Sequence, residues 1–333
     1  MRFLKRLFAV LLVLVIVYLF GPHPSTPLYD QSLQAVPSEA ASLEKYVSEQ
    51  ESKHKLKPDN EARIVWANDS TKQKTEYAIV YLHGFSASQE EGNPVHRNLA
   101  KQFGCNLYLS RLSQHGIDTT DALAYMTADN LWESAKEAYA IGKQLGNKVI
   151  LMGTSTGGTL ALQLAAAYPE VAGLVLFSPN IAINDPNAWL LNNPWGLQIA
   201  RLVKGSKLNT AGTNTPEYNK YWNHTYRLEA TVQLEELLET AMNDNNLSKI
   251  KQPTLVLYYY KDEAHQDKVV KVSAMKDMFV HLGTLEEQKK MIPIPEAGNH
   301  VLGSPIQSKD IITVEKEAVL FMKKTLHLTT IEH

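Results

Sequence analysis

The feature that most constrains this chain is a serine flanked by glycines, at the junction between a predicted strand and a predicted helix. Residues 148–152 form a short apolar run that is partly β-branched, and residues 158–167 are rich in helix formers. Between them stands the sequence Gly153-Thr154-Ser155-Thr156-Gly157. A sharp strand-to-helix turn exposes such a serine above the sheet edge and points the helix N-terminus at it. The segment therefore predicts a nucleophilic Ser155.

Other roles for a glycine- and serine-rich turn are a plain loop or a phosphate-binding cradle. No lysine follows the glycines, which argues against a phosphate-binding P-loop. A trypsin-like serine is excluded as well, because that serine lies in an all-β protein without a following helix.

The rest of the chain alternates between strand and helix patterns. Strand patterns cover residues 62–66, 76–82, 106–109, 173–177, 254–259 and 291–294, and helical patterns cover 38–54, 94–103, 129–145 and 309–325, with Asp129 as the expected cap of the third helix. Such alternation in short steps predicts an α/β fold with a mostly parallel central sheet flanked by helices. We expect its core to comprise residues 59–185 and 251–330.

Composition excludes some function classes. The 333 residues carry a net charge of −2, so there is no electrostatic case for binding nucleic acid. Cys105 is the only cysteine, which rules out an intramolecular disulfide. No metal site and no cofactor are expected.

An insertion interrupts the alternation at residues 186–250. It is rich in tryptophan and tyrosine and contains helical patterns at 196–203 and 230–242. An insertion after the carboxyl end of a strand hangs over the ligand crevice of an open sheet, so we interpret it as a small helical lid. The alternative is an extra pair of structural helices.

The N-terminal segment has the charge pattern of a targeting sequence. Arg2, Lys5 and Arg6 precede an unbroken apolar stretch over residues 7–20, without a small-residue cleavage site after it. We favour an uncleaved signal-anchor at residues 1–20 over a cleaved signal peptide, although a full span needs about 20 apolar residues. A buried helix of the fold is the third option. Residues 21–58 are then a tether and an N-terminal helix, and the catalytic domain lies on the outer (periplasmic or extracellular) side of a membrane.

A nucleophilic serine needs a base that is held by a carboxylate. In this kind of fold the chain order is serine, acid, histidine. Asp262 directly follows the strand pattern at 254–259 and is the preferred acid, with Glu263 and Asp267 as alternatives. His300 follows the last strand and is the preferred base.

His281 and His265 are weaker candidates for the base. His281 stands inside a helical pattern, and His265 is only three residues from the proposed acid. Two backbone N–H groups are predicted to form the oxyanion hole, that of Thr156 at the helix N-terminus and that of Phe85 in the turn His83-Gly84-Phe85. We expect His83 to shape that turn and not to act as a second base.

These motifs together resemble the α/β-hydrolase superfamily over about residues 60–326. The resemblance rests on Leu82-His83-Gly84-Phe85, Arg111-Leu112-Ser113-Gln114-His115-Gly116, Gly153-Thr154-Ser155-Thr156-Gly157-Gly158, Asp262 and Gly298-Asn299-His300. The sequence is most similar to the monoacylglycerol lipases, carboxylesterases and serine aminopeptidase-like hydrolases. Gln114 departs from that group, which usually has glycine there. The resemblance implies a short lid, ester substrates and no cofactor.

The predicted function is hydrolysis of a carboxylic ester, such as a monoacylglycerol or a medium-chain acyl ester, through a Ser155–His300–Asp262 triad and an acyl-enzyme. Expected partners are a small acyl ester or lipid substrate and, through the N-terminal segment, a membrane. An amide or peptide hydrolase and an acyltransferase are alternatives on the same fold. A non-catalytic binding protein is a third hypothesis, but it predicts a broken triad.

Overall fold

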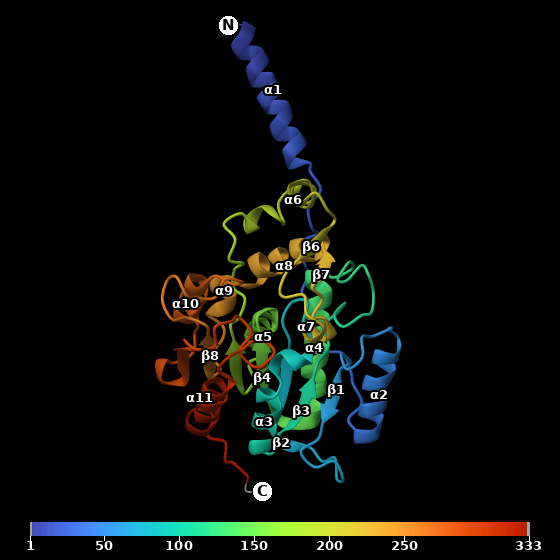
Figure 1. The fold of residues 1–333 in the computed structure, drawn as a ribbon, viewed down its shortest axis with the longest axis vertical. Coiled ribbons are helices and arrows are strands. Elements are labelled where there is room, and N and C mark those ends of the chain that lie inside the picture. Colours follow the sequence, from blue (N-terminus) through green and yellow to red (C-terminus); the bar gives the residue numbers. More distant parts are fainter. Residues whose placement is uncertain (1, 332–333) are drawn as a thin grey trace.

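The computed structural model describes residues 2–331 and centres on a seven-stranded sheet (Figure 1). The strands follow the spatial order β1-β3-β2-β4-β5-β8-β9, and only β1 is antiparallel to its neighbour. Their bounds are β1 Arg63–Val65, β2 Thr75–Leu82, β3 Asn106–Leu109, β4 Gly146–Thr154, β5 Gly173–Phe177, β8 Thr254–Tyr258 and β9 Lys289–Pro293. The predicted α/β fold is confirmed.

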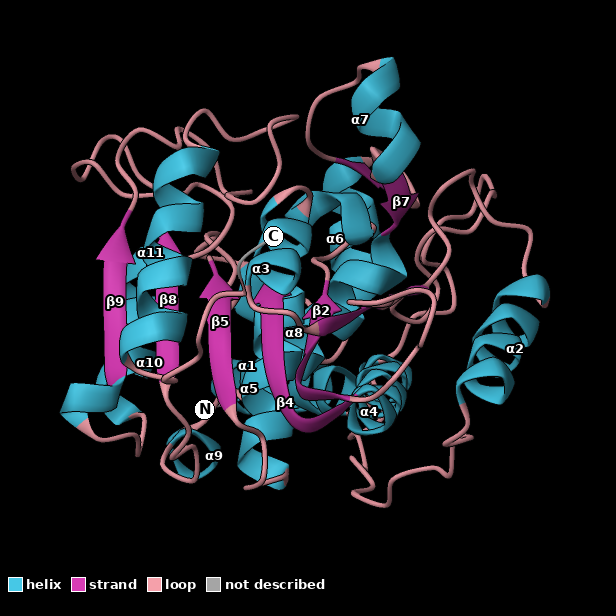
Figure 2. Cartoon of the chain, turned by 90° about the horizontal axis from the view of Figure 1, so that it is seen from below, coloured by secondary structure: helices cyan, strands magenta, loops and turns pink. Residues whose placement is uncertain are grey.

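Helices cover both faces of this sheet (Figure 2). The bounds of the helices of the core are η1 Gln89–Gly92, α3 Val95–Gln102, α4 Ala128–Leu145, α5 Thr156–Ala167, α10 Val272–His281, η3 Glu286–Gln288 and α11 Ile311–Lys324, and α2 Ala40–Ser52 precedes the sheet. One apolar cluster joins α4, α5 and α8 to one face, and another joins α3 and α11 to the other. Because both faces are covered, the central strands are apolar without alternation.

The helix α4 begins differently from the prediction. Thr127, not Asp129, is its N-cap, and Thr127 forms a capping box with Asn130. The Asp129 carboxylate instead accepts the N–H groups of Leu28 and Tyr29. The Trp132 indole also donates to the Asp30 carbonyl, at 2.7 Å. These contacts hold residues 21–37 against the body, so this segment is a strap and not a free tether.

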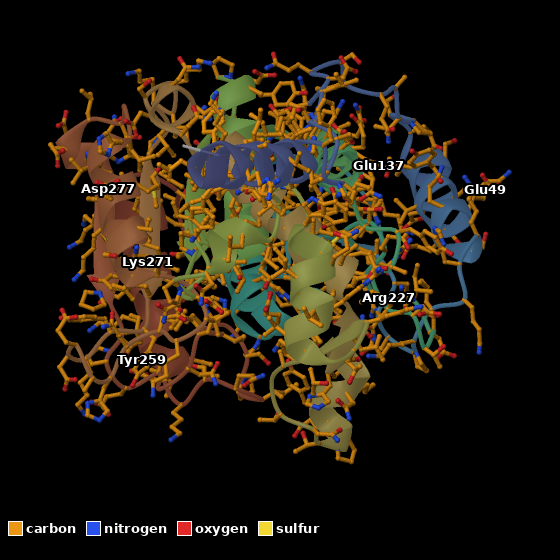
Figure 3. The ribbon with its side chains drawn as sticks, turned by 90° about the horizontal axis from the view of Figure 1, so that it is seen from above. Glu49, Glu137, Arg227, Tyr259, Lys271 and Asp277 are labelled. Atoms are coloured by element: carbon orange, nitrogen blue, oxygen red, sulfur yellow. The ribbon has the colours of Figure 1, made fainter. Side chains whose placement is uncertain are left out.

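The insertion at residues 186–250, called the lid from here on, contains more structure than the two helices predicted for it. Its elements are η2 Ala188–Leu190, α6 Gly196–Lys204, β6 Leu208–Thr210, α7 Pro216–Tyr221, β7 Thr225–Arg227, α8 Leu228–Ala241 and α9 Asp244–Leu247. The hairpin β6–β7 was missed because each strand has only three residues. Arg227, labelled in Figure 3, ties the lid to the body by an ion pair with Asp121 at 2.8 Å.

The N-terminal segment forms helix α1 Arg2–Leu19, which projects from the body beside α6 (Figure 1). Its apolar side chains are exposed, so it is not a buried helix of the fold. The Trp195 indole donates to the Val17 carbonyl at 3.0 Å and holds the base of α1 against the lid. Within residues 2–331, no helix combines the length and the apolarity needed to cross a membrane. The predicted membrane-spanning anchor is therefore not supported.

Candidate functional site

Ser155 occupies a strained turn between β4 and α5, as the sequence predicts. Its backbone has φ 53° and ψ −119°, a conformation that a non-glycine residue rarely adopts and that costs about 1–3 kcal/mol. A Cβ at Gly157 would lie 1.9 Å from the Leu82 carbonyl oxygen, and a Cβ at Gly153 would lie 2.5 Å from the Gly157 carbonyl oxygen. Only glycine fits at either position, which explains the spacing of the motif.

Backbone hydrogen bonds hold this turn against the end of β5. The Ser155 N–H donates to the Phe177 carbonyl at 2.9 Å, and the Ser155 carbonyl accepts the N–H of Asn180 at 3.0 Å. The N–H of Thr159 also donates to the Ser155 carbonyl, at 3.1 Å. The strain is thus maintained by bonds from the next strand and from the first turn of α5.

His300 is paired with Asp267. The Nδ1–H of His300 donates to Asp267 Oδ2 at 2.6 Å, and Asp267 is only 1% exposed. The other Asp267 oxygen, Oδ1, accepts the N–H groups of Val269 and Val270 at 2.8 and 3.1 Å. The carboxylate is therefore fixed in one orientation, and it fixes the histidine ring in turn.

The predicted acid, Asp262, does not contact His300. It lies exposed and interacts with His265, whose Nδ1 is 2.8 Å from Asp262 Oδ1. The chain after β8 forms a narrow loop closed by a bridge between Tyr260 and Gln266, which places Asp262 near the tip and Asp267 at the base. The carboxylate that contacts His300 is therefore Asp267 and not the predicted Asp262. The available sequence signal was the apolar Val270, which is buried and brings the chain, and Asp267 with it, back to the core.

The electrostatic environment of His300 makes its side chain a stronger base than an ordinary histidine. Burial alone lowers its pKa, but the charge of Asp267 and the hydrogen bond to it, with a smaller contribution from the charge of Glu91, outweigh burial and raise the pKa above its ordinary value. The other ring nitrogen, Nε2, is buried and has no hydrogen-bond partner among the described residues. With Nδ1 occupied by Asp267, Nε2 is the atom available to take a proton.

The predicted oxyanion-hole residues lie where two loops meet. Thr156 is the first residue of α5, and the N–H groups of a first turn have no partner inside the helix. Within residues 2–331, no protein atom accepts a hydrogen bond from the Phe85 N–H. His83 uses both ring nitrogens structurally: Nδ1 donates to the Gly84 carbonyl at 2.9 Å and Nε2 accepts the Leu112 N–H at 3.0 Å. It is therefore not a second base, as expected.

The supporting loop around residues 111–116 contains the departure noted in the sequence. Gln114 has φ 66°, a left-handed conformation that favours glycine. The neighbouring His115 accepts the Ser86 N–H at Nε2, at 3.0 Å, and so braces the chain just after Phe85. The substitution affects a supporting turn and none of the reactive groups.

Ser155, His300 and Phe85 line one cavity of about 760 Å³ between the sheet edge and the lid. Most of its lining is apolar, and the lid contributes most of the apolar side chains: Leu190, Leu191, Ile199, Ala200, Val203, Tyr218, Trp222, Tyr226, Leu228 and Leu234. In the described part of the chain, no cluster of histidine, cysteine and acidic side chains is arranged to bind a metal ion. The arrangement is suited to nucleophilic chemistry on a mostly apolar substrate.

Comparison with known proteins is consistent with this geometry. The family model described as "Serine aminopeptidase, S33" (Hydrolase_4) matches residues 73–298, a span that includes Ser155 and Asp267 and ends just before His300. A thermostable monoacylglycerol lipase of Bacillus sp. (strain H-257) is 28% identical over 189 residues, which cover 56% of this chain and 70% of the lipase.

Solved structures share the fold. One from a study of LipS and LipT, two metagenome-derived lipolytic enzymes, has a TM-score of 0.65 at 18% identity and covers 81% of this chain and 100% of its own. The monoacylglycerol lipase of Paleococcus ferrophilus gives 0.56 at 16% identity, covering 78% and 97%, and a monoglyceride lipase of Saccharomyces cerevisiae gives 0.57 at 15%, covering 81% and 92%. With the family match spanning most of the sheet, the chain belongs to the serine aminopeptidase S33 family and is an esterase- or lipase-like α/β-hydrolase.

Proposed function

We propose that this protein hydrolyses carboxylic esters through a triad of Ser155, His300 and Asp267. The observation that carries the proposal is the buried His300–Asp267 pair, whose histidine lines the same cavity as the strained Ser155 turn. A strained nucleophile, an oriented base and a buried acid are together more than a structural turn requires.

In the proposed mechanism, Ser155 Oγ attacks the ester carbonyl carbon while His300 Nε2 takes its proton. The negative oxygen of the tetrahedral intermediate accepts the N–H groups of Phe85 and Thr156. The intermediate collapses, the bond to the alcohol breaks, and His300 gives the proton to the leaving alcohol. Water, deprotonated by His300, then attacks the acyl-serine and releases the acid. Asp267 keeps Nδ1 protonated throughout and stabilises the imidazolium.

The preferred substrate is a monoacylglycerol or another medium-chain acyl ester. The cavity of about 760 Å³ is large enough for an acyl chain, and its lid side is apolar. The similarity to a monoacylglycerol lipase supports the same substrate class. A panel of p-nitrophenyl esters of increasing chain length tests this, with the highest kcat/KM expected at medium length.

The nucleophile is tested with a fluorophosphonate probe. Wild-type protein should be labelled covalently, and Ser155→Ala should lose all labelling and at least about 10⁴-fold in kcat, because Ser155 is the proposed nucleophile and forms the acyl-enzyme. Ser86→Ala is a matched control, since that serine lines the same cavity. Labelling of Ser155→Ala at the wild-type rate would refute the proposal.

Hydrolysis of an amide or peptide is the second candidate, supported by the family description "Serine aminopeptidase". The triad serves both reactions, so the site geometry does not separate them. Parallel assays on a p-nitrophenyl ester and an aminoacyl p-nitroanilide decide between them. The ester proposal expects the higher kcat/KM on the ester.

We also propose an outer, periplasmic or extracellular, location for the hydrolase. The proposal is based on the cationic N-terminus followed by an apolar stretch. Protease added to intact cells or spheroplasts should digest the protein, whereas digestion only after lysis would contradict the proposal.

A further inference from the structure

A second buried carboxylate, Glu91, lies beside the candidate site and is not part of the triad. It belongs to η1, is 2% exposed, and lines the same cavity as Ser155. The Gly84 N–H donates to Glu91 Oε2 at 2.5 Å. A Cβ at Gly84 would lie 2.9 Å from Glu91 Oε1 and 3.1 Å from Ser155 Cβ, so the carboxylate and the nucleophile flank the same glycine.

Further contacts of Glu91 reach three other parts of the site. The Tyr81 hydroxyl interacts with the carboxylate and is hydrogen-bonded to Thr154 Oγ1, next to the nucleophile, at 2.9 Å. The Trp222 indole of the lid also favours its charged form, and the carboxylate acts electrostatically on His300. Glu91 therefore joins the nucleophile turn, the turn that contains Phe85, and the lid.

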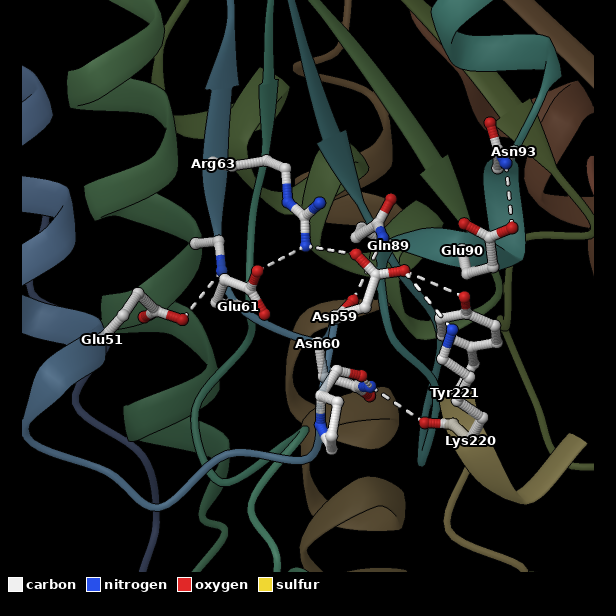
Figure 4. A network of polar contacts seen from close by, with 12 residues as sticks. Glu51, Asp59, Asn60, Glu61, Arg63, Gln89, Glu90, Asn93, Lys220 and Tyr221 are labelled. Carbon is white, nitrogen blue, oxygen red and sulfur yellow. Dashed lines mark hydrogen bonds and ion pairs between the residues drawn. The ribbon is translucent and has the colours of Figure 1, made fainter. Parts of the chain in front are cut away.

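The short helix that carries Glu91 is itself fixed. The His96 ring donates from Nε2 to the Gln89 carbonyl at 2.8 Å. On the other side, the Gln89 amide donates to the Asp59 carbonyl, and Asp59 accepts the Tyr221 hydroxyl of the lid at 2.9 Å (Figure 4). Glu91 thus has little freedom to turn away from Gly84.

Burying this carboxylate is unfavourable for folding. Among the described residues it forms no ion pair with lysine or arginine, and burial raises its pKa to about 7 against the opposing effect of the Gly84 hydrogen bond. A buried acid without a cationic partner destabilises the folded state unless its hydrogen bonds compensate. A residue kept at such a cost beside a nucleophile is a candidate for a functional role.

We propose that Glu91 is the positioning residue of the oxyanion hole: by accepting the Gly84 N–H while contacting Tyr81 and Trp222, it sets the direction of the adjacent Phe85 N–H. The Gly84 N–H and the Phe85 N–H lie in consecutive peptide units that are joined at the Gly84 Cα, so a rotation of the first unit displaces the Phe85 donor through Gly84. Glu91 does not touch the reacting atoms. The inference rests on the proposed ester hydrolysis, in which Phe85 stabilises the oxyanion.

Three variants test this role. Glu91→Met has similar length but no comparable acceptor, Glu91→Gln keeps a carbonyl that can accept the Gly84 N–H, and Glu90→Gln is a control on the same short helix. Loss of an oxyanion donor typically reduces kcat about 10²–10³-fold. We expect Glu91→Met to lose about 10²-fold in kcat on a p-nitrophenyl ester with little change in KM, Glu91→Gln to recover to within about tenfold of wild type, and Glu90→Gln to match wild type.

Two measurements separate positioning from a general loss of structure. The rate of fluorophosphonate labelling should fall in parallel with kcat, because that reaction also uses the oxyanion hole. The affinity for 1-decanol, a non-reacting occupant of the cavity, should stay unchanged. Glu91→Met should unfold near the wild-type temperature, since removing the buried charge offsets the lost Gly84 bond.

Several results would overturn the inference. These are a kcat of Glu91→Met within twofold of wild type, an inactive Glu91→Gln, or an equal loss of decanol binding and kcat. Failure of the proposed function has a different signature, because wild-type protein would then neither hydrolyse the ester nor react with the probe.

Discussion

The nucleophile turn and the loop after β8 each carry one proposed member of the triad, but they obtain their geometry in different ways. Ser155 is oriented by its immediate neighbours, since Gly153 and Gly157 admit a turn that any Cβ would block. Asp267 is oriented by its contact with His300, 33 residues further along the chain, and by the bridge that closes the base of its own loop. A local motif fixes the first residue, and tertiary structure selects the second.

Exchanging the two aspartates for asparagine tests this comparison most strongly. Asp267→Asn keeps the shape of the side chain but removes the charge that stabilises the imidazolium and favours the wrong histidine tautomer. We expect kcat to fall roughly 10⁴-fold, as for the acid of a serine triad. Asp262→Asn should change kcat less than twofold. Steady-state kinetics on one ester suffice, and the opposite ranking would restore Asp262 as the acid.

This pair also shows how far the sequence could be used for prediction. The strand–helix alternation, Ser155 and His300 followed from patterns within single segments, and so did the structural role of His83. The choice among Asp262, Glu263 and Asp267 did not, because all three follow β8 and only the fold of the loop separates them. The strap at residues 21–37 and the position of Glu91 depend likewise on partners distant in sequence.

Substituting Gly157 tests the claim that the glycines beside Ser155 in the sequence orient the nucleophile. In Gly157→Ala the new Cβ would overlap the Leu82 carbonyl, so the turn must open, and we expect a loss of more than about 3 kcal/mol in the free energy of unfolding together with lost fluorophosphonate labelling. Gly205→Ala is the control. Unlike Gly157, that glycine has a positive φ, 61°, but nothing lies within 4 Å of its Cβ position, so only a loss of about 1 kcal/mol from backbone strain is expected. Urea unfolding measures both, and equal losses would argue against the steric explanation.

The pH dependence of kcat/KM tests the electrostatic link between the two regions. His300 must be neutral to accept the serine proton, so activity falls as pH decreases through its pKa. Because Asp267 raises that pKa, the acidic limb of wild type should lie above the position of an ordinary histidine. In Asp267→Asn the residual activity should show this limb at lower pH. An unmoved limb would mean that another group controls it.

The smallest expected effect concerns a left-handed residue outside the nucleophile turn. Gln114, like Ser155, has a positive φ, but its side chain has no role in the proposed reaction. Gln114→Gly relieves the strain and at the same time makes the unfolded chain more flexible, so we expect a net stabilisation of no more than about 1 kcal/mol with kcat unchanged. Urea unfolding and the ester assay together measure this. The strained backbone at Ser155 exposes the proposed nucleophile, whereas the strained backbone at Gln114 has no role that a glycine could not fill. A drop in kcat in Gln114→Gly would contradict that distinction.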